Sequence, residues 1–356
     1  MDGTPTMSSL VDENRTLLAQ VQRNCQIADS RHAQDYTLCT YLLKMREYYR
    51  WAHDLGYDHV LCGSDVSEWV DAQEQQWDEL EGSEFTPLEI DGETVDAFDT
   101  NRVNGMVNDR GFVYSAGLGR LSRPMFFYGE LTGTANLEGY QVLISGKEWA
   151  RCMTAPPAMA HGDTIFIRRD ALRRMLWETI EDWRWAKREN ALARAIRFYD
   201  FDRDVDAALE CMTDHEIEAV ILHEIGEIVA GQILGSEWHT MLGDIGGPNT
   251  EFMVRAVRDH LADCMSSLPA LLSNADTPSL HFYFANLTAM RKDLFPALNV
   301  AYQYWVDRDD LSRLKTVVRS GKNHWMTVAD RILQCHRRHG NQCQQPIQNL
   351  LNASRL

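Results

Sequence analysis

The feature that most constrains the fold is a segment near the centre of the chain, residues 219–234, that is apolar all round apart from one charged patch. In a helix drawn through this segment, Leu222 and Val229 lie on one side, and Val220 and Leu234 lie on the opposite side. A helix that is apolar on every side is buried inside a protein. We therefore expect a helical core built around residues 219–234.

The charged patch consists of His223, Glu224 and Glu227, which fall on one stripe roughly 100° wide at the helical repeat. Two carboxylates beside an imidazole are costly to bury unless they are paired or coordinated, and like charges one turn apart repel. His223 and Glu227 have the spacing to reach one metal ion, and Glu224 is placed to act as a general base on a bound water. The alternative is a structural helix held by salt bridges.

A second helix, expected between residues 249 and 268, offers further ligands. We expect Asp263 to be the third metal ligand, followed by Asp259 or His260, because Asp259 and Asp263 are one helical turn apart. The alternative for Asp259 is an exposed ion pair with a neighbouring arginine, Arg255 or Arg258.

The first long helix, expected between residues 27 and 51, carries a polar stripe on its apolar face that includes His32, Asp35 and Arg46. This stripe would line a pocket, bind metal through His32 and Asp35, or form a buried hydrogen-bond network. Arg46 is a candidate for holding an anionic group of a substrate, because a guanidinium group binds carboxylates and phosphates bidentately.

Two resemblances accompany these patterns. The stretch Leu222–Glu227 is locally similar to the HExxH helix of zinc proteases, with Glu227 in place of the second histidine, and to the second-histidine helix of HD phosphohydrolases. The segments 24–33 and 38–47, with the pattern NCxIxDxRHAxD followed by LCTYLLKMRE, are similar to a family of uncharacterised bacterial proteins. That second resemblance implies one integrated fold over most of the chain and no particular activity.

Hydrophobic periodicity predicts a mainly α protein with a multi-helix, bundle-like core and a small β-rich insertion. Residues 1–81 contain the N-terminal helices, and residues 82–168 are rich in glycine, asparagine and β-forming residues. Short strands are expected there at 111–114, 125–130 and 140–144, with a further candidate at 164–167. Residues 169–356 read as helices again and carry the expected metal site. We expect this last region to pack with residues 1–81 as one core.

The composition limits the partners and the location of the protein. The chain of 356 residues has 52 acidic and 35 basic side chains and a net charge of −17, which argues against binding to nucleic acid. No apolar run is long enough to cross a membrane, and the N-terminus has no signal pattern. The eight cysteines are scattered, as in proteins of the reducing cytoplasm. The sequence thus predicts a cytoplasmic protein and leaves a homo-oligomer open.

These observations favour a metal-dependent enzyme that acts on a small molecule, using zinc, iron or manganese, with hydrolysis slightly preferred. Glu224 and Arg46 are the expected catalytic residues. One alternative is an iron-dependent oxidase or oxygenase with a carboxylate-rich mono- or di-iron site. A second alternative is a non-catalytic binding or scaffold protein with a buried ion-pair network. The neighbours of His223 and Glu227 discriminate between a metal site and an ion-pair network. Further carboxylates beside these residues would need a metal ion to balance their charge, whereas arginines would balance the charge of Glu227 without one.

Overall fold

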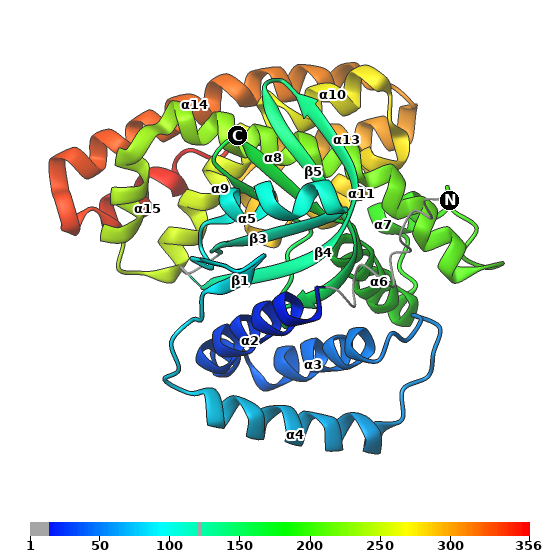
Figure 1. Ribbon diagram of the computed structural model, residues 1–356. Coiled ribbons are helices and arrows are strands. Elements are labelled where there is room, and N and C mark those ends of the chain that lie inside the picture. Colours follow the sequence, from blue (N-terminus) through cyan, green and yellow to red (C-terminus); the bar gives the residue numbers. More distant parts are fainter. Residues whose placement is uncertain (1–13, 120–122) are drawn as a thin grey trace. The chain divides into compact units, whose positions relative to one another are not determined.

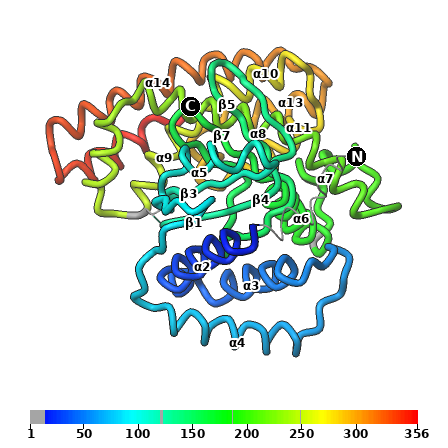
Figure 2. The backbone as a smooth tube through the Cα atoms, viewed as in Figure 1, coloured from blue at the N-terminus to red at the C-terminus, as the bar shows by residue number. Residues whose placement is uncertain are grey.

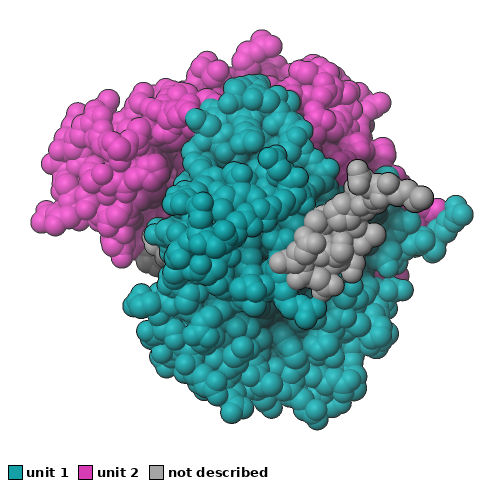
Figure 3. Space-filling model, viewed as in Figure 1, with its two compact units in different colours: residues 1–179, 202–213 teal, residues 180–201, 214–356 magenta. Residues whose placement is uncertain are grey.

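The computed structural model describes residues 14–119 and 123–356 and divides the chain into two compact units. Unit 1 comprises residues 1–179 and 202–213, and unit 2 comprises residues 180–201 and 214–356 (Figure 3). Most described residues are helical, and a small sheet is the main β structure. The predicted fold class, mainly α with a small β-rich part, is confirmed.

Unit 1 is built from helices around a five-stranded sheet whose strand order is β3-β4-β5-β7-β6. Its helices are α2 (Arg15–His32), α3 (Leu38–Ala52), α4 (Gly63–Leu80), α5 (Thr100–Val107) and the first part of α6 (Arg169–Ala186). The strands of the sheet are β3 (Phe112–Leu118), β4 (Pro124–Leu137), β5 (Tyr140–Arg151), β6 (Ala158–His161) and β7 (Thr164–Arg168). A separate short hairpin is formed by β1 (Leu88–Ile90) and β2 (Glu93–Val95).

The core of unit 1 lies between α2 and the sheet, because α2 packs on β4 and β5 (Figures 1 and 2). Val21 and Cys25 of α2 meet the aromatic side chains of Phe112 and Phe126 there. The strands β3, β4 and β5 are antiparallel neighbours, whereas β5 and β7 run parallel. The pairing of β4 with β5 is interrupted by register shifts around Gly129, which lies opposite Glu148. Such bulges bend a strand and re-aim its side chains.

All regular secondary structure in the described part of unit 2 is helical. It contains α7 (Ala191–Ile196), residues 214–244 of α8 (Val205–Asp244), α9 (Pro248–Met265), α10 (Ser267–Asn274), α11 (Thr277–Asn286), α12 (Ala289–Leu294), α13 (Pro296–Arg308), α14 (Ser312–His339) and α15 (Gln344–Asn352). The long helix α14 packs on α9 and α13 (Figure 1). Its Trp325 is fully buried with Leu261 of α9 and Phe295, which precedes α13.

A membrane-spanning helix, which must be both long and apolar, is absent from residues 14–119 and 123–356.

Candidate functional site

Unit 2 brings three of the expected metal ligands together where α8 packs on α9. The Nδ1 atom of His223 is 2.9 Å from Oδ1 of Asp263, and its Nε2 atom is 3.4 Å from Oε1 of Glu227. Helix spacing places His223 beside Glu227 on α8, and α9 adds the carboxylate of Asp263 to this pair. Asp263 is 1% exposed, so its charge must be balanced within the protein.

Arginines supply that balance. Arg291 of α12 contacts Oδ2 of Asp263, and the Tyr283 hydroxyl donates a hydrogen bond of 2.9 Å to the same oxygen. Arg258 donates a hydrogen bond of 2.9 Å to Oε2 of Glu227. Burial alone would raise the pKa of Asp263, but Arg291 and His223 hold this pKa well below its usual range. These contacts form one connected network of ion pairs and hydrogen bonds, which we call the His223 network. Its members are His223, Glu227, Arg258, Asp263, Tyr283 and Arg291.

The other residues of unit 2 that the sequence proposed as ligands or as the base lie at the edge of the His223 network or outside this network. Burial raises the pKa of the half-buried Glu224 to about 7, and that of Asp259 is also raised by burial. Asp259 is 3.7 Å from Arg258, in line with the alternative of an ion pair. His260 faces the core, where its ring stacks on Trp325. Within the described ranges, no group of three or more His, Cys, Asp or Glu side chains could hold a metal ion.

The helix expected between residues 27 and 51 is two helices, α2 and α3, separated by a short 3-10 turn at Ala33–Asp35, so His32, Asp35 and Arg46 do not share one helical stripe. All three residues belong to unit 1. His32 lies 3.2 Å from Asp35, measured from Nδ1 to Oδ2, and Asp35 is also 3.1 Å from Arg123. Arg46 donates a hydrogen bond of 2.8 Å to Glu47. His32 and Asp35 are thus paired with each other, and Arg46 contacts the carboxylate of its own neighbour.

The close packing that joins α8 to α9 depends on Gly226. A Cβ atom at this position would lie 2.7 Å from the backbone oxygen of Ala262 and 3.1 Å from the Cβ atom of Ser266. The Ser266 hydroxyl also donates a hydrogen bond of 2.6 Å to the backbone oxygen of Leu222. The absent side chain of Gly226 therefore lets α9 approach closely enough for Asp263 to reach His223.

We expect Gly226→Ala to lower the free energy of unfolding by about 1–3 kcal/mol, because the added methyl group collides with backbone. Gly231→Ala is the matched control, since it lies in the same helix and a Cβ atom there meets nothing within 4 Å. The control should be neutral or stabilising by up to about 1 kcal/mol, as alanine favours helix. Urea denaturation of both variants measures the difference. Equal stabilities would contradict the close approach.

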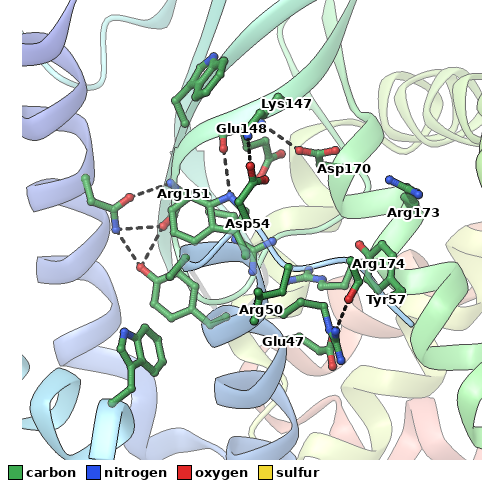
Figure 4. A pocket seen from close by; sticks show the side chains of 18 of the residues that line it. Glu47, Arg50, Asp54, Tyr57, Lys147, Glu148, Arg151, Asp170, Arg173 and Arg174 are labelled. Atoms are coloured by element: carbon green, nitrogen blue, oxygen red, sulfur yellow. Dashed lines mark hydrogen bonds and ion pairs between the residues drawn. The ribbon is translucent and has the colours of Figure 1, made fainter. Parts of the chain in front are cut away.

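A larger candidate site lies in unit 1, where a pocket of about 620 Å³ is lined by α2, α3, α4, β5 and α6 (Figure 4). We call it the arginine pocket. Four acidic and five basic side chains line it, together with the aromatic rings of Tyr48, Trp51, Tyr57, Trp69 and Trp149. The acidic side chains are Glu47, Asp54, Glu148 and Asp170, and the basic ones are Arg50, Lys147, Arg151, Arg173 and Arg174.

Most of the basic side chains of the arginine pocket already have an acidic partner. The pairs are Arg50 with Glu47 at 3.3 Å, Lys147 with Asp54 at 2.8 Å, Arg173 with Asp206 at 3.0 Å, and Arg174 with Glu178 at 3.6 Å. Asp170 instead accepts a hydrogen bond from the backbone N–H of Glu148. Among the described residues, no carboxylate pairs with Arg151.

Arg151 is the last residue of β5 and is 1% exposed. Its guanidinium group lies over the rings of Tyr48 and Trp51, at 5.6 Å and 5.1 Å from their centres. Its Nε and Nη2 atoms are buried and have no hydrogen-bond partner in the described part of the chain. Burial, together with the nearby charge of Arg174, lowers the pKa of Arg151 to about 10. At neutral pH Arg151 is therefore a buried positive charge that makes no ion pair with a carboxylate of the described residues, although the charge of the nearby Glu148 partly offsets its burial.

The surroundings of Arg151 are held in place by hydrogen bonds. Its backbone N–H donates to the Gln22 side chain at 3.0 Å, and Gln22 in turn donates to the Tyr48 hydroxyl at 2.8 Å. The Trp51 indole N–H donates to the backbone oxygen of Glu148 at 3.0 Å. These contacts fix α2 and α3 against the end of β5, so the unpaired guanidinium group sits in a preorganised frame (Figure 4).

Sequence reasoning missed Arg151, because the strand expected at residues 140–144 ends before it, whereas β5 continues to residue 151. Short basic clusters such as the one that contains Arg173 and Arg174 are typical of a solvated helix face, yet Arg174 is only 9% exposed. The available signal was the polar stripe of the first long helix, which pointed to a pocket and to Arg46. Arg50, one turn later on the same helix, is the residue that lines the pocket.

Comparison with known proteins identifies a family whose function is unknown. A model of the N-terminal domain of a family of unknown function (DUF6866) matches residues 16–168, and a model of the C-terminal domain of that family matches residues 173–354. No curated protein and no solved structure matches the chain.

Proposed function

The chain belongs to this family of unknown function, and we propose that it binds a small organic anion in the arginine pocket. The observation that carries the proposal is Arg151, a buried arginine that lines a pocket and whose charge and two side-chain nitrogens have no partner among the described residues. An isolated buried charge costs several kcal/mol, and the rings of Tyr48 and Trp51 offset only part of that cost. A bound anion would supply the missing partner.

The two unpartnered nitrogens also define the geometry of the expected contact. Nε and Nη2 lie on the same edge of a guanidinium group and can bind one carboxylate through two parallel hydrogen bonds. Arg168 uses these two nitrogens to bind the two carboxylate oxygens of Glu148 at 2.6 and 2.7 Å. The corresponding nitrogens of Arg151 have no partner in the described part of the chain. Both atoms are buried, so an anion would reach them only when a lining side chain moves aside.

The size and composition of the arginine pocket fit a small molecule. Its volume of about 620 Å³ lies within the range of roughly 300–1,000 Å³ that is usual for ligand sites. Aromatic side chains in the walls, of which this pocket has five, are also typical of such sites. The small-molecule partner expected from the sequence is therefore retained in this proposal, as a ligand of unit 1.

The variant Arg151→Met tests the proposal. We expect acetate, succinate or benzoate to raise the melting temperature of the wild-type chain, and the affinity to fall at least about a hundredfold in the variant, because two charge-assisted hydrogen bonds are lost. Without ligand the variant should be no less stable than the wild type, since an unpaired buried charge is removed. Calorimetric titration measures the affinity.

Arg102→Met is the matched control, because Arg102 carries the same charge in unit 1 but is exposed and outside the pocket. Its affinity for the anions should equal that of the wild type. Equal binding by wild type and Arg151→Met, or binding of none of the three anions, would contradict the proposal.

Metal-dependent hydrolysis and iron-dependent oxidation at the His223 network remain predictions of the sequence. Arg258 and Arg291 provide the positive charge that a metal ion was expected to provide, which supports the alternative of an ion-pair network. Elemental analysis of the purified protein decides the question. A transition metal that is bound by the wild type and lost in His223→Ala/Glu227→Ala would restore the metal hypothesis. The bacterial origin, the cytoplasmic location and the homo-oligomer also remain predictions.

A further inference from the structure

We infer that the ligand of the arginine pocket is a flat aromatic carboxylate with a single negative charge. This inference rests on the proposed function and adds to it the charge and the shape of the ligand. The charge is argued from the ionised groups that line the pocket, and the shape from its aromatic walls.

The charges of the pocket favour a monoanion. Each of the other four basic lining residues has a carboxylate partner, whereas Arg151 has none among the described residues. A carboxylate would neutralise that charge. A phosphate monoester, which carries between −1.5 and −2 charges at neutral pH, would place extra negative charge beside the carboxylates of Glu47, Glu148 and Asp170.

The walls of the pocket favour a flat ring. The half-buried side chains of Trp51, Trp69 and Trp149 line it. Trp51 stacks on Tyr48 with ring centres 5.3 Å apart and planes 6° apart, and Trp69 meets Tyr48 edge-on at 5.6 Å. A fixed aromatic wall favours stacking or edge contacts with another ring.

The positions for the charge and for the ring are adjacent. The guanidinium group of Arg151 lies within 5.6 Å of the ring centres of both Tyr48 and Trp51. A carboxylate that pairs with this guanidinium group would therefore lie next to the aromatic wall. A ring attached directly to that carboxylate would reach the indole side chains without a long linker.

Four probes of similar size separate these features in calorimetric titrations of the full chain. Naphthalene-2-carboxylate has the ring and one charge, and decahydronaphthalene-2-carboxylate has the charge without the aromatic ring. Naphthalene-2-carboxamide has the ring without charge, and 2-naphthyl phosphate has the ring and nearly two charges at pH 8. We expect naphthalene-2-carboxylate to bind most tightly, the saturated acid about two- to tenfold more weakly, and the amide not at all.

Trp69→Leu provides the second measurement. It should reduce the affinity for naphthalene-2-carboxylate but leave that for the saturated acid unchanged, and Trp69→Phe should restore most of the loss. Equal affinities of the two acids would overturn the aromatic ligand, and tighter binding of 2-naphthyl phosphate would overturn the single charge. Binding of either acid that depends on Arg151 would leave the proposed function intact in both cases. Failure of both acids to bind would overturn the proposed function together with the inference.

Discussion

Replacing Asp263 by alanine is expected to lower the free energy of unfolding of unit 2 by about 3–5 kcal/mol, because Arg291 and His223 then remain in the structure without their carboxylate. Asp263 is 1% exposed, so water cannot take its place without rearrangement. The Tyr283 hydroxyl loses its acceptor as well. Urea denaturation measures the total effect, and hydrogen exchange of α8 and α9 locates it in unit 2.

Two further variants separate the buried pair from a general effect of lost charge. In Asp263→Ala/Arg291→Met both charges are removed, and the cost should be smaller than in the single variant. Asp293→Ala breaks the exposed pair with Arg355, and the cost should be about 0–1 kcal/mol. If Asp263→Ala were as mild as Asp293→Ala, the His223 network would contribute little to the stability of unit 2.

The pH dependence of unit 2 should follow from the same network. The folded-state pKa of Asp263 is lowered, so its stabilisation is complete above the unfolded pKa of about 3.9 and is lost as the pH falls. Although burial opposes protonation of His223, Asp263 and Glu227 raise its pKa well above the usual value. Its contribution is complete below the unfolded pKa of about 6.5 and is lost as the pH rises through the folded pKa.

The second large effect is expected in unit 1, where Glu148→Gln should lower the free energy of unfolding by about 3–5 kcal/mol. Both side chains of the Glu148–Arg168 pair are 0% exposed, and two hydrogen bonds of 2.6 and 2.7 Å join them. Arg168 also lies over the ring of Phe127, 4.3 Å from its centre. The neutral amide would leave the guanidinium charge buried without a counter-charge. Urea denaturation, with hydrogen exchange of β5 and β7, measures the loss.

The control for this variant is Glu93→Gln, which changes the same residue type in unit 1 but at an exposed pair with Arg102. Its expected cost is about 0–1 kcal/mol. The double variant Glu148→Leu/Arg168→Met should recover much of the lost stability, since it removes both charges. A loss in Glu148→Gln that is no larger than in Glu93→Gln would show that the pair is not buried in solution.

Periodicity in the sequence was sufficient to predict the mainly helical regions and the positions of four strands, but it did not predict β1, β2 and β6. The single helix expected between residues 27 and 51 was wrong, because α2 ends at His32 and Thr37 caps a new helix, α3. The apolar runs at 111–114, 125–130, 140–144 and 164–167 correspond to β3, β4, β5 and β7. The lengths of β4 and β5 were missed, because polar and glycine residues in 131–137 and 145–151 break the apolar pattern. Pairing between neighbouring strands decides those lengths, and it depends on contacts far apart in the sequence.

In the candidate site, too, the sequence predicts contacts within one helix but not contacts between elements far apart in the chain. Helix spacing places His223 beside Glu227, and the structure adds Asp263 from α9. Arg291 contacts Asp263 from α12, 28 residues further along the chain, and no spacing rule links the two. Arg151 likewise contacts the rings of Tyr48 and Trp51, which lie about 100 residues earlier in the sequence. A buried charge is recognisable as unpaired only once every neighbour is placed.

The most direct test of anion binding at Arg151 is the nitrogen-15 NMR signal of its side-chain Nε–H, assigned through its loss in Arg151→Lys. During titration of the full chain with naphthalene-2-carboxylate, this signal should shift and saturate with the dissociation constant found by calorimetry. The Arg102 signal should stay fixed. An Arg151 signal that does not move while calorimetry reports binding would place the anion elsewhere and contradict the account.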